Sequence, residues 1–183
     1  MTTGDRSAPR LALWFLPEGA PYRALQALIA RLSAEHRSPL FEPHVTLLGH
    51  ITLPAEEAKA RAERLARLLH PFTLRLNRAE RGTGYFRALY LRAEPDPALR
   101  EAHRLARTVF GREGDPPYLP HLSLLYGDFP VATRQRILAE IGPWHEIVVP
   151  VRGLHLVDTS GVPEGWRRIA EVELGDGTPA GTA

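Results

Sequence analysis

The chain has 183 residues, 44% of them apolar, a formal net charge of +2 and no cysteine. This length and composition are typical of one globular domain, or of two small lobes that share a core. The absence of cysteine excludes disulfides, thiolate nucleophiles and cysteine–zinc sites, and the small net charge argues against a protein that coats nucleic acid by bulk charge.

Hydrophobic periodicity and the positions of proline and glycine divide the chain into alternating strands and helices. In chain order the pattern predicts a strand over 11–16, a helix over 20–37, a strand over 43–53, a helix over 54–69, strands over 72–77 and 85–93, a helix over 97–110, a strand over 119–126, a helix over 133–141, and strands over 146–158 and 166–174. Each half supplies one histidine-bearing strand after a helix. This weak duplication predicts an α+β fold with two similar lobes that face each other.

The two ends of the chain differ from its middle. Residues 1–9 and 175–183 are small and polar, and we expect both to be flexible. The segment between them, 10–174, is expected to form a single bilobal domain. No apolar run approaches the ~20 residues of a membrane helix, so we expect a cytoplasmic protein without a membrane partner.

One motif occurs twice. Residues 43–50 read PHVTLLGH and residues 120–127 read PHLSLLYG. Because side chains alternate between the faces of a strand, His44 and Thr46 point the same way, and so do His121 and Ser123. Two such strands side by side would gather two imidazoles and two hydroxyls around one small group, for which a phosphate is the natural candidate.

A single H-x-[ST] tripeptide carries little information, because about one is expected by chance in a chain of this composition. Indeed, residues 50–52 read HIT and are a third match. Only His44 and His121 share the longer pattern of proline, histidine, apolar residue, hydroxyl, leucine and leucine. We therefore interpret His50 as a bystander.

The paired motif resembles the signature of the two-histidine phosphoesterase superfamily. More narrowly, the chain is similar to the cyclic nucleotide phosphodiesterases of plants and yeast, and it is related to the bacterial 2′-5′ RNA ligase-like group. The segments that carry the resemblance are LWFLP at 13–17, PHVTLLG at 43–49, RGTGYF at 81–86, PYLPHLSLLYG at 117–127 and the strand from Trp166 onward.

This resemblance implies two pseudo-symmetric lobes of antiparallel sheet plus helices around a central cleft. It also implies hydrolysis of cyclic phosphates on ribose without a metal or other cofactor. By position, His44 and His121 would be the catalytic pair, and the substrate-binding residues would be Thr46, Ser123, Tyr126, Trp166 and Thr83. The implied partners are a small cyclic phosphate or an RNA end, and we expect a monomer.

The chemistry of the residues agrees with this implication. A neutral histidine can take a proton from water while a protonated one gives a proton to the departing ribose oxygen. Nucleoside 2′,3′-cyclic phosphates, RNA ends and ADP-ribose 1″,2″-cyclic phosphate all present the required group, and the sequence does not choose among them. Nor does it say which histidine is the acid.

Three alternatives remain open at this stage. The histidines could ligate a metal, although zinc sites need three or four protein ligands and these motifs bring neither cysteine nor paired carboxylates. The chain could bind RNA or nucleotides without hydrolysing them. The histidines could also be structural core residues, but that reading leaves the matched hydroxyls unexplained. A bias toward arginine, with Lys59 as the sole lysine, fits either genome composition or phosphate binding.

Overall fold

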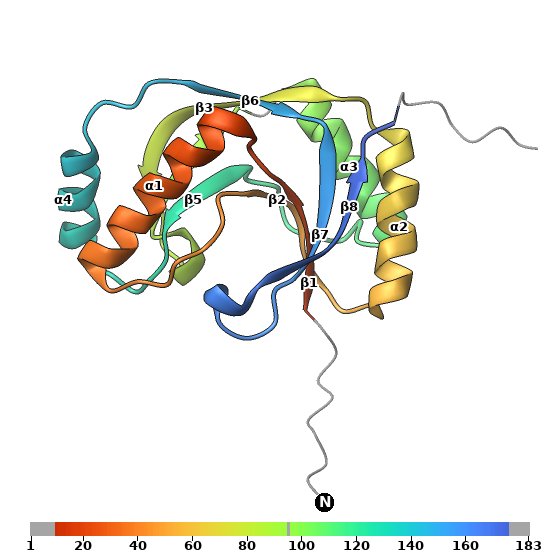
Figure 1. The fold of residues 1–183 in the computed structure, drawn as a ribbon, viewed down its shortest axis with the longest axis horizontal. Helices are drawn as coiled ribbons and strands as arrows, with labels where there is room; N and C mark the ends of the chain where they lie inside the picture. The colour runs from red at the N-terminus through yellow and green to blue at the C-terminus, as the bar shows by residue number, and fades with distance from the viewer. Residues whose placement is uncertain (1–9, 95, 176–183) are drawn as a thin grey trace, which may run out of the picture.

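The computed structural model describes residues 10–94 and 96–175 (Figure 1). Of the ends expected to be flexible, 1–9 and 175–183, all residues except Gly175 lie outside the described residues. The strands are β1 (Leu11–Phe15), β2 (Val45–Ile51), β3 (Phe72–Arg81), β4 (Leu89–Ala93), β5 (His121–Leu125), β6 (Ile147–Val151), β7 (Gly153–Asp158) and β8 (Arg167–Glu173). The helices are α1 (Gly19–His36), α2 (Ala55–Leu68), α3 (Pro97–Phe110) and α4 (Val131–Ile141).

All the described strands belong to one sheet with the order β6-β3-β4-β5-β2-β1-β7-β8, and each pairing is antiparallel. The predicted α+β class is therefore confirmed. The two lobes are the two halves of this sheet, which meet where Val45 of β2 pairs with Leu122 of β5. On either side of this seam, β1 flanks β2 and β4 flanks β5, so the two histidine strands are adjacent and occupy corresponding places in the two halves.

The sheet is strongly curved. Strands β6 and β7 lie in opposite halves of the sheet, yet only Arg152 separates them in the chain. The sheet must therefore curl until its β6 edge approaches β7, as Figure 1 shows. The single strand predicted over 146–158 is wrong here, because the chain changes strand partner at Arg152, between two apolar strands. Pro150 is tolerated because β6 is an edge strand.

The strand predicted over 85–93 also begins later than expected. Tyr85–Arg87 form a short 3-10 helix, and pairing with β3 starts at Leu89. The preceding turn is tight, since a Cβ on Gly82 would clash with the carbonyl oxygen of Arg87. Glycine at this position lets the chain fold back and brings the 3-10 helix against β5.

The helices pack in pairs on the two halves of the sheet. α1 and α4 contact β5, β6 and β3. α2 and α3 contact mainly β7, β8 and β2, with smaller contacts of α2 to β1 and of α3 to β3. Helix α3 shows local agreement between sequence and structure: the Asp96 carboxylate accepts a hydrogen bond from the Leu99 N–H at 2.8 Å, Pro97 opens the helix, and Gly111 ends it at φ 68°.

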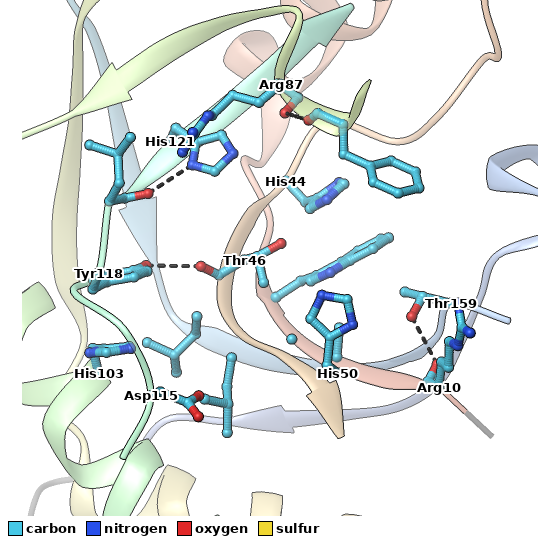
Figure 2. Close-up of a pocket in the computed structure, with 18 of the residues that line it drawn as sticks. Arg10, His44, Thr46, His50, Arg87, His103, Asp115, Tyr118, His121 and Thr159 are labelled. Atoms are coloured by element: carbon cyan, nitrogen blue, oxygen red, sulfur yellow. Dashed lines mark hydrogen bonds between the residues drawn. The ribbon is translucent and has the colours of Figure 1, made fainter. Parts of the chain in front are cut away.

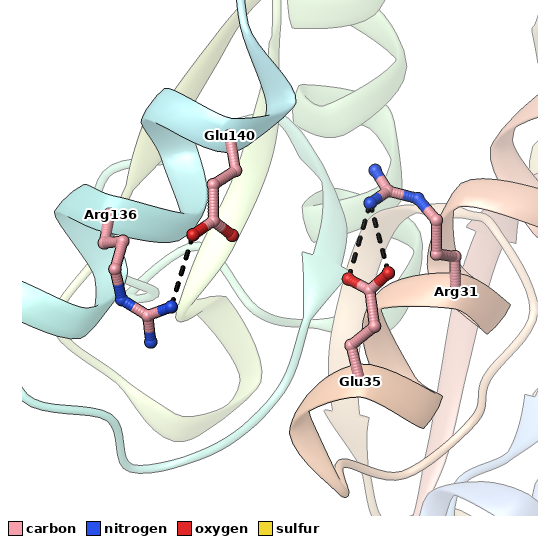
Figure 3. A network of polar contacts seen from close by, with 4 residues as sticks. All are labelled: Arg31, Glu35, Arg136 and Glu140. Atoms are coloured by element: carbon pink, nitrogen blue, oxygen red, sulfur yellow. Dashed lines mark hydrogen bonds and ion pairs between the residues drawn. The ribbon is translucent and has the colours of Figure 1, made fainter.

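The exposed faces of α1 and α4 carry ion pairs one turn apart, Arg31–Glu35 at 3.4 Å and Arg136–Glu140 at 3.2 Å (Figure 3). Such exposed pairs contribute about 0.3–0.5 kcal/mol each. Burial of the apolar faces, for example Leu25 and Ile29 on α1, therefore holds these helices on the sheet.

Candidate active site

A cavity of about 490 Å³ opens at the seam between the two halves of the sheet. Most of the predicted site residues line it together: His44, Thr46, His121, Ser123, Tyr126 and Trp166. Figure 2 shows His44, Thr46 and His121 around one space. Thr83 is the exception, because it is exposed in the turn before the 3-10 helix and does not line the cavity.

The two histidines are held in the same way. Nδ1 of His44 lies 2.6 Å from the carbonyl oxygen of Glu42, and Nδ1 of His121 lies 2.7 Å from that of Leu119. A carbonyl oxygen can only accept, so each Nδ1 must carry the proton of this bond. Each neutral ring therefore keeps an unprotonated Nε2, which can accept a proton from another group.

The surroundings of the two rings differ. His44 is 6% exposed and stacks on Trp14 with ring centres 3.6 Å apart and an angle of 10°. The rings of Phe41 and Trp166 meet it edge-on. His121 instead contacts the edge of Tyr90, with ring centres 5.4 Å apart. The environment of His44 is thus almost entirely apolar.

These surroundings set the protonation of the pair. Burial lowers the pKa of His44 to about 4. The hydrogen bond to the Glu42 carbonyl raises this pKa, and the charge of His121 lowers it further. Burial also lowers the pKa of His121, and the charge of Arg87 adds to it. Because His44 is buried more deeply than His121, the charged form of the pair is favoured on His121.

The two hydroxyls are engaged differently. Thr46 is half-buried, and its backbone carbonyl accepts a hydrogen bond from the Tyr118 hydroxyl at 2.9 Å, which fixes this part of β2. The Ser123 hydroxyl is buried and donates to the Phe86 carbonyl at 2.8 Å. Since a serine hydroxyl has one proton to donate, that of Ser123 must turn away from Phe86 before it can donate to a ligand.

The two predicted aromatic contacts form one wall of the cavity. Tyr126 is buried and stacks on Phe41 with ring centres 3.7 Å apart. Trp166 is half-buried and meets Tyr126 at 6.0 Å and Phe86 at 5.9 Å, both tilted. Within the described part of the chain, the buried Nε1 of Trp166 has no hydrogen-bond partner. This N–H can donate to a ligand.

One lining residue that the sequence did not single out is Arg87. Its guanidinium carbon lies 5.7 Å from the centre of the Tyr90 ring, and Figure 2 shows its side chain reaching toward His121. Arginine is the residue best suited to bidentate phosphate binding. The sequence offered one signal for Arg87, its position just after the RGTG segment at 81–84. Its place beside the cavity, however, depends on the 3-10 helix Tyr85–Arg87.

Within residues 10–94 and 96–175, no cluster of three or more His, Asp or Glu side chains is arranged to hold a metal ion. None of the helices in that part of the chain is both long and apolar enough to cross a membrane.

Known proteins resemble this chain in both sequence and fold. It is 32% identical over 117 residues to a cyclic phosphodiesterase of Arabidopsis thaliana, a match that covers 64% of this chain and only 65% of the relative's length. The E. coli LigT structure with NADP+ superposes with a TM-score of 0.62 at 20% identity, covering 93% of this chain and 99% of LigT. The LigT structure with 3′-AMP gives 0.60 at 19% identity, covering 91% and 98%.

The similarity to LigT concerns the fold alone at these identities. Family membership rests on a stronger finding, since the model of the 2′-5′ RNA ligase superfamily matches residues 17–163. This range contains both histidine motifs and ends just before Trp166. The chain therefore belongs to the 2′-5′ RNA ligase superfamily, and the resemblance to two-histidine phosphoesterases predicted from its paired motifs is confirmed.

Proposed function

We propose that this protein is a phosphodiesterase that hydrolyses 2′,3′-cyclic phosphates on nucleosides or RNA ends and releases the 2′-phosphate. ADP-ribose 1″,2″-cyclic phosphate presents the same reacting group and belongs to the proposed substrate class. The observation that carries the proposal is the equivalent fixing of His44 and His121 through Nδ1 beside one shared cavity. The name of the Arabidopsis relative, cyclic phosphodiesterase, supports it.

The unequal burial of the two imidazoles supports an assignment of roles. His44, whose pKa is lowered to about 4, is neutral and serves as the base: its Nε2 takes a proton from the attacking water. As the water oxygen bonds to phosphorus, the bond from phosphorus to the 3′ oxygen breaks. Protonated His121 gives its Nε2 proton to that oxygen. Imidazoles perform both proton transfers, so the scheme requires no metal ion.

The negative charge of the phosphoryl group needs donors as well as proton transfer. The Thr46 hydroxyl, the Ser123 hydroxyl once it turns from Phe86, and the Arg87 guanidinium line the same cavity as the two histidines. Donors of this kind stabilise the extra charge on the phosphoryl oxygens in the transition state. The anion also favours the protonated form of His121, against the effect of burial.

The aromatic wall would bind the rest of the nucleotide. The ring of Tyr126 is held by its stack on Phe41, and the Trp166 indole keeps its N–H unpaired among the described residues. A rigid aromatic wall with one donor suits the face of a ribose or a nucleobase. Because Thr83 is exposed and outside the cavity lining, its predicted contact with substrate requires a ligand that extends over the rim.

A panel of cyclic phosphates tests the proposal, with the product phosphate located by phosphorus NMR in the presence of excess EDTA. We expect turnover of nucleoside 2′,3′-cyclic phosphates to 2′-phosphates, unchanged by EDTA and lost in His44→Ala. Exclusive formation of 3′-phosphates would contradict the assigned bond cleavage. Tight binding of nucleotides without turnover across the panel would favour a nucleotide- or RNA-binding protein instead.

A further inference from the structure

The cavity extends beyond the histidine pair to a far end built from three separate segments. Arg10 lies just before β1, His50 lies near the end of β2, and Thr159 lies just after β7, and all three line the same cavity as His44. Figure 2 shows His50 between Thr46 and Arg10, on the side of the cavity away from Arg87. The reaction proposed above leaves this far end unused.

The backbone of His50 has an unusual conformation. Leu13 pairs with Leu48 and Leu11 with Ile51, so Gly49 and His50 together lie opposite one residue of β1, which makes a β-bulge. His50 has φ 53°, in the left-handed region. This conformation costs a non-glycine residue about 1 kcal/mol or more. Glycine would adopt it freely, yet the glycine of this bulge stands one position earlier.

Side-chain hydrogen bonds from Arg112, which also lines the cavity, hold the bulge in place. Arg112 donates through Nη1 to the carbonyl oxygens of His50 at 3.0 Å and Gly49 at 3.3 Å. Its Nε donates to the Asp115 carboxylate at 2.8 Å. Arg112 thus fixes the strained backbone while its own charge is paired with Asp115. The exposed imidazole of His50 therefore extends from a fixed backbone in the lining of the cavity.

Arg10 is fixed next to it by its backbone. The Arg10 N–H donates to the Ser160 hydroxyl at 3.0 Å, and the Arg10 carbonyl accepts from the Thr159 hydroxyl at 2.8 Å. The guanidinium itself forms no ion pair with a carboxylate of the described residues. An imidazole donates through an N–H in either protonation state, and a guanidinium only donates. Two donor side chains on fixed backbones, one of them a guanidinium without a carboxylate partner among the described residues, favour an anion.

We propose that His50 and Arg10 form a second anion subsite, which binds a phosphate on the 5′ oxygen of the ribose whose cyclic phosphate lies between His44 and His121. The 5′ oxygen is at the opposite end of the ribose from the 2′ and 3′ oxygens. In the same way, His50 and Arg10 lie at the end of the cavity opposite Arg87, so a ribose bound through its cyclic phosphate would direct its 5′ oxygen toward them. This inference rests on the proposed function. It narrows the substrate class to cyclic phosphates whose ribose also carries a phosphate on the 5′ oxygen: a 5′-monoester, the diester of an RNA end, or the diphosphate of ADP-ribose 1″,2″-cyclic phosphate.

Three substrates test the subsite: adenosine 2′,3′-cyclic phosphate, its 5′-phosphorylated form, and the dinucleotide ApA with a 2′,3′-cyclic end. We expect the wild type to prefer a 5′-phosphate at least tenfold in kcat/KM, as typical for charged hydrogen bonds. His50→Asn, which tolerates the left-handed backbone, and Arg10→Gln should each lower this preference about tenfold. Arg64→Gln, on the exposed face of α2, is the matched control and should keep the preference.

The responses of the two phosphorylated substrates identify the source of the phosphate. A preference for the monoester alone assigns the subsite to terminal phosphates, and a preference shared by ApA extends it to RNA ends. The inference would be overturned if the wild type showed nearly equal kcat/KM with and without the 5′-phosphate. It would also be overturned if His50→Asn and Arg10→Gln kept the preference as Arg64→Gln does.

A binding measurement tests the anion subsite independently of the proposed hydrolysis. In calorimetry, adenosine 2′,5′-bisphosphate should bind at least tenfold tighter than adenosine 2′-monophosphate, and His50→Asn and Arg10→Gln should abolish the difference. If no substrate is turned over but this difference is found, the proposed hydrolysis fails and the subsite stands. Equal binding of the two ligands by the wild type refutes the subsite whatever the turnover.

Discussion

Replacing Trp14 by leucine should raise the pKa of His44 and reduce activity selectively at acidic pH. The indole covers one face of the imidazole at 3.6 Å, and burial is the largest cause of the lowering of that pKa to about 4. A smaller side chain admits water, which stabilises the charged ring. Because His44 must be neutral to act as the base, a higher pKa moves the acidic limb of kcat/KM to higher pH.

The size of the expected loss of activity depends on how far the pKa of His44 rises, and two limiting cases bracket it. If the pKa of His44 returned to 6.5, its neutral fraction at pH 5 would fall from about 0.9 to about 0.03. The ratio of variant to wild-type kcat/KM would then drop roughly twentyfold between pH 7 and pH 5. Phe41 and Trp166 stay against the ring, and a rise only to about pKa 5 would give roughly a twofold drop.

The assay is kcat/KM for a nucleoside cyclic phosphate across pH, since this constant reports the ionisation of the free enzyme. Trp144→Leu is the matched control: it removes a packed indole, whose Nε1 donates to the Leu76 carbonyl at 3.1 Å, without touching the cavity lining. An unchanged acidic limb in a folded Trp14→Leu variant would refute the assignment of His44 as a base made neutral by burial.

The remaining predictions concern the other groups around the phosphate. His44→Ala and His121→Ala should each lower kcat/KM by ~10²–10⁴ in steady-state assays, the usual contribution of general acid–base catalysis; a loss under tenfold in both would contradict it. Thr46→Val and Ser123→Ala should each lower kcat by ~10–10³, as loss of an oxyanion donor does, and normal kcat in both would make the hydroxyls structural. Arg87→Gln should raise KM and shift the basic limb of the kcat/KM profile to higher pH, because removal of this charge raises the pKa of His121. A basic limb that stays in place would contradict that effect of Arg87.

The strand period was sufficient to predict the centre of the site. Alternation along 43–47 and 120–124 places each histidine and its hydroxyl on one face, and all four side chains line one cavity. This succeeded because the relevant geometry is local: two residues on one strand keep their relationship wherever the strand is placed. Whether these four residues act as proposed stays a prediction.

Features that depend on distant segments were not predictable in the same way. The stack of Trp14 on His44 requires β1 to pair with β2 in a particular register, and two irregularities interrupt that register. The same bulge places His50 in the cavity lining, although sequence reasoning treated it as a bystander. The change of strand partner at Arg152 is likewise invisible in the hydrophobic pattern, because both β6 and β7 are apolar.

The approximate symmetry of the fold has a chemical consequence. Two copies of one motif, fixed by the same bond to a carbonyl two residues earlier, would by themselves give two histidines of equal pKa, and a proton would be shared equally between them. Acid–base catalysis instead requires one neutral and one protonated group. The difference comes from the neighbouring strands at equivalent positions: β1 contributes Trp14 beside His44, whereas β4 contributes Tyr90 beside His121, with its hydroxyl bonded to Glu80 at 2.6 Å. In the proposed mechanism, duplication of the motif supplies the geometry, and divergence of the flanking strands distinguishes the proposed base from the proposed acid.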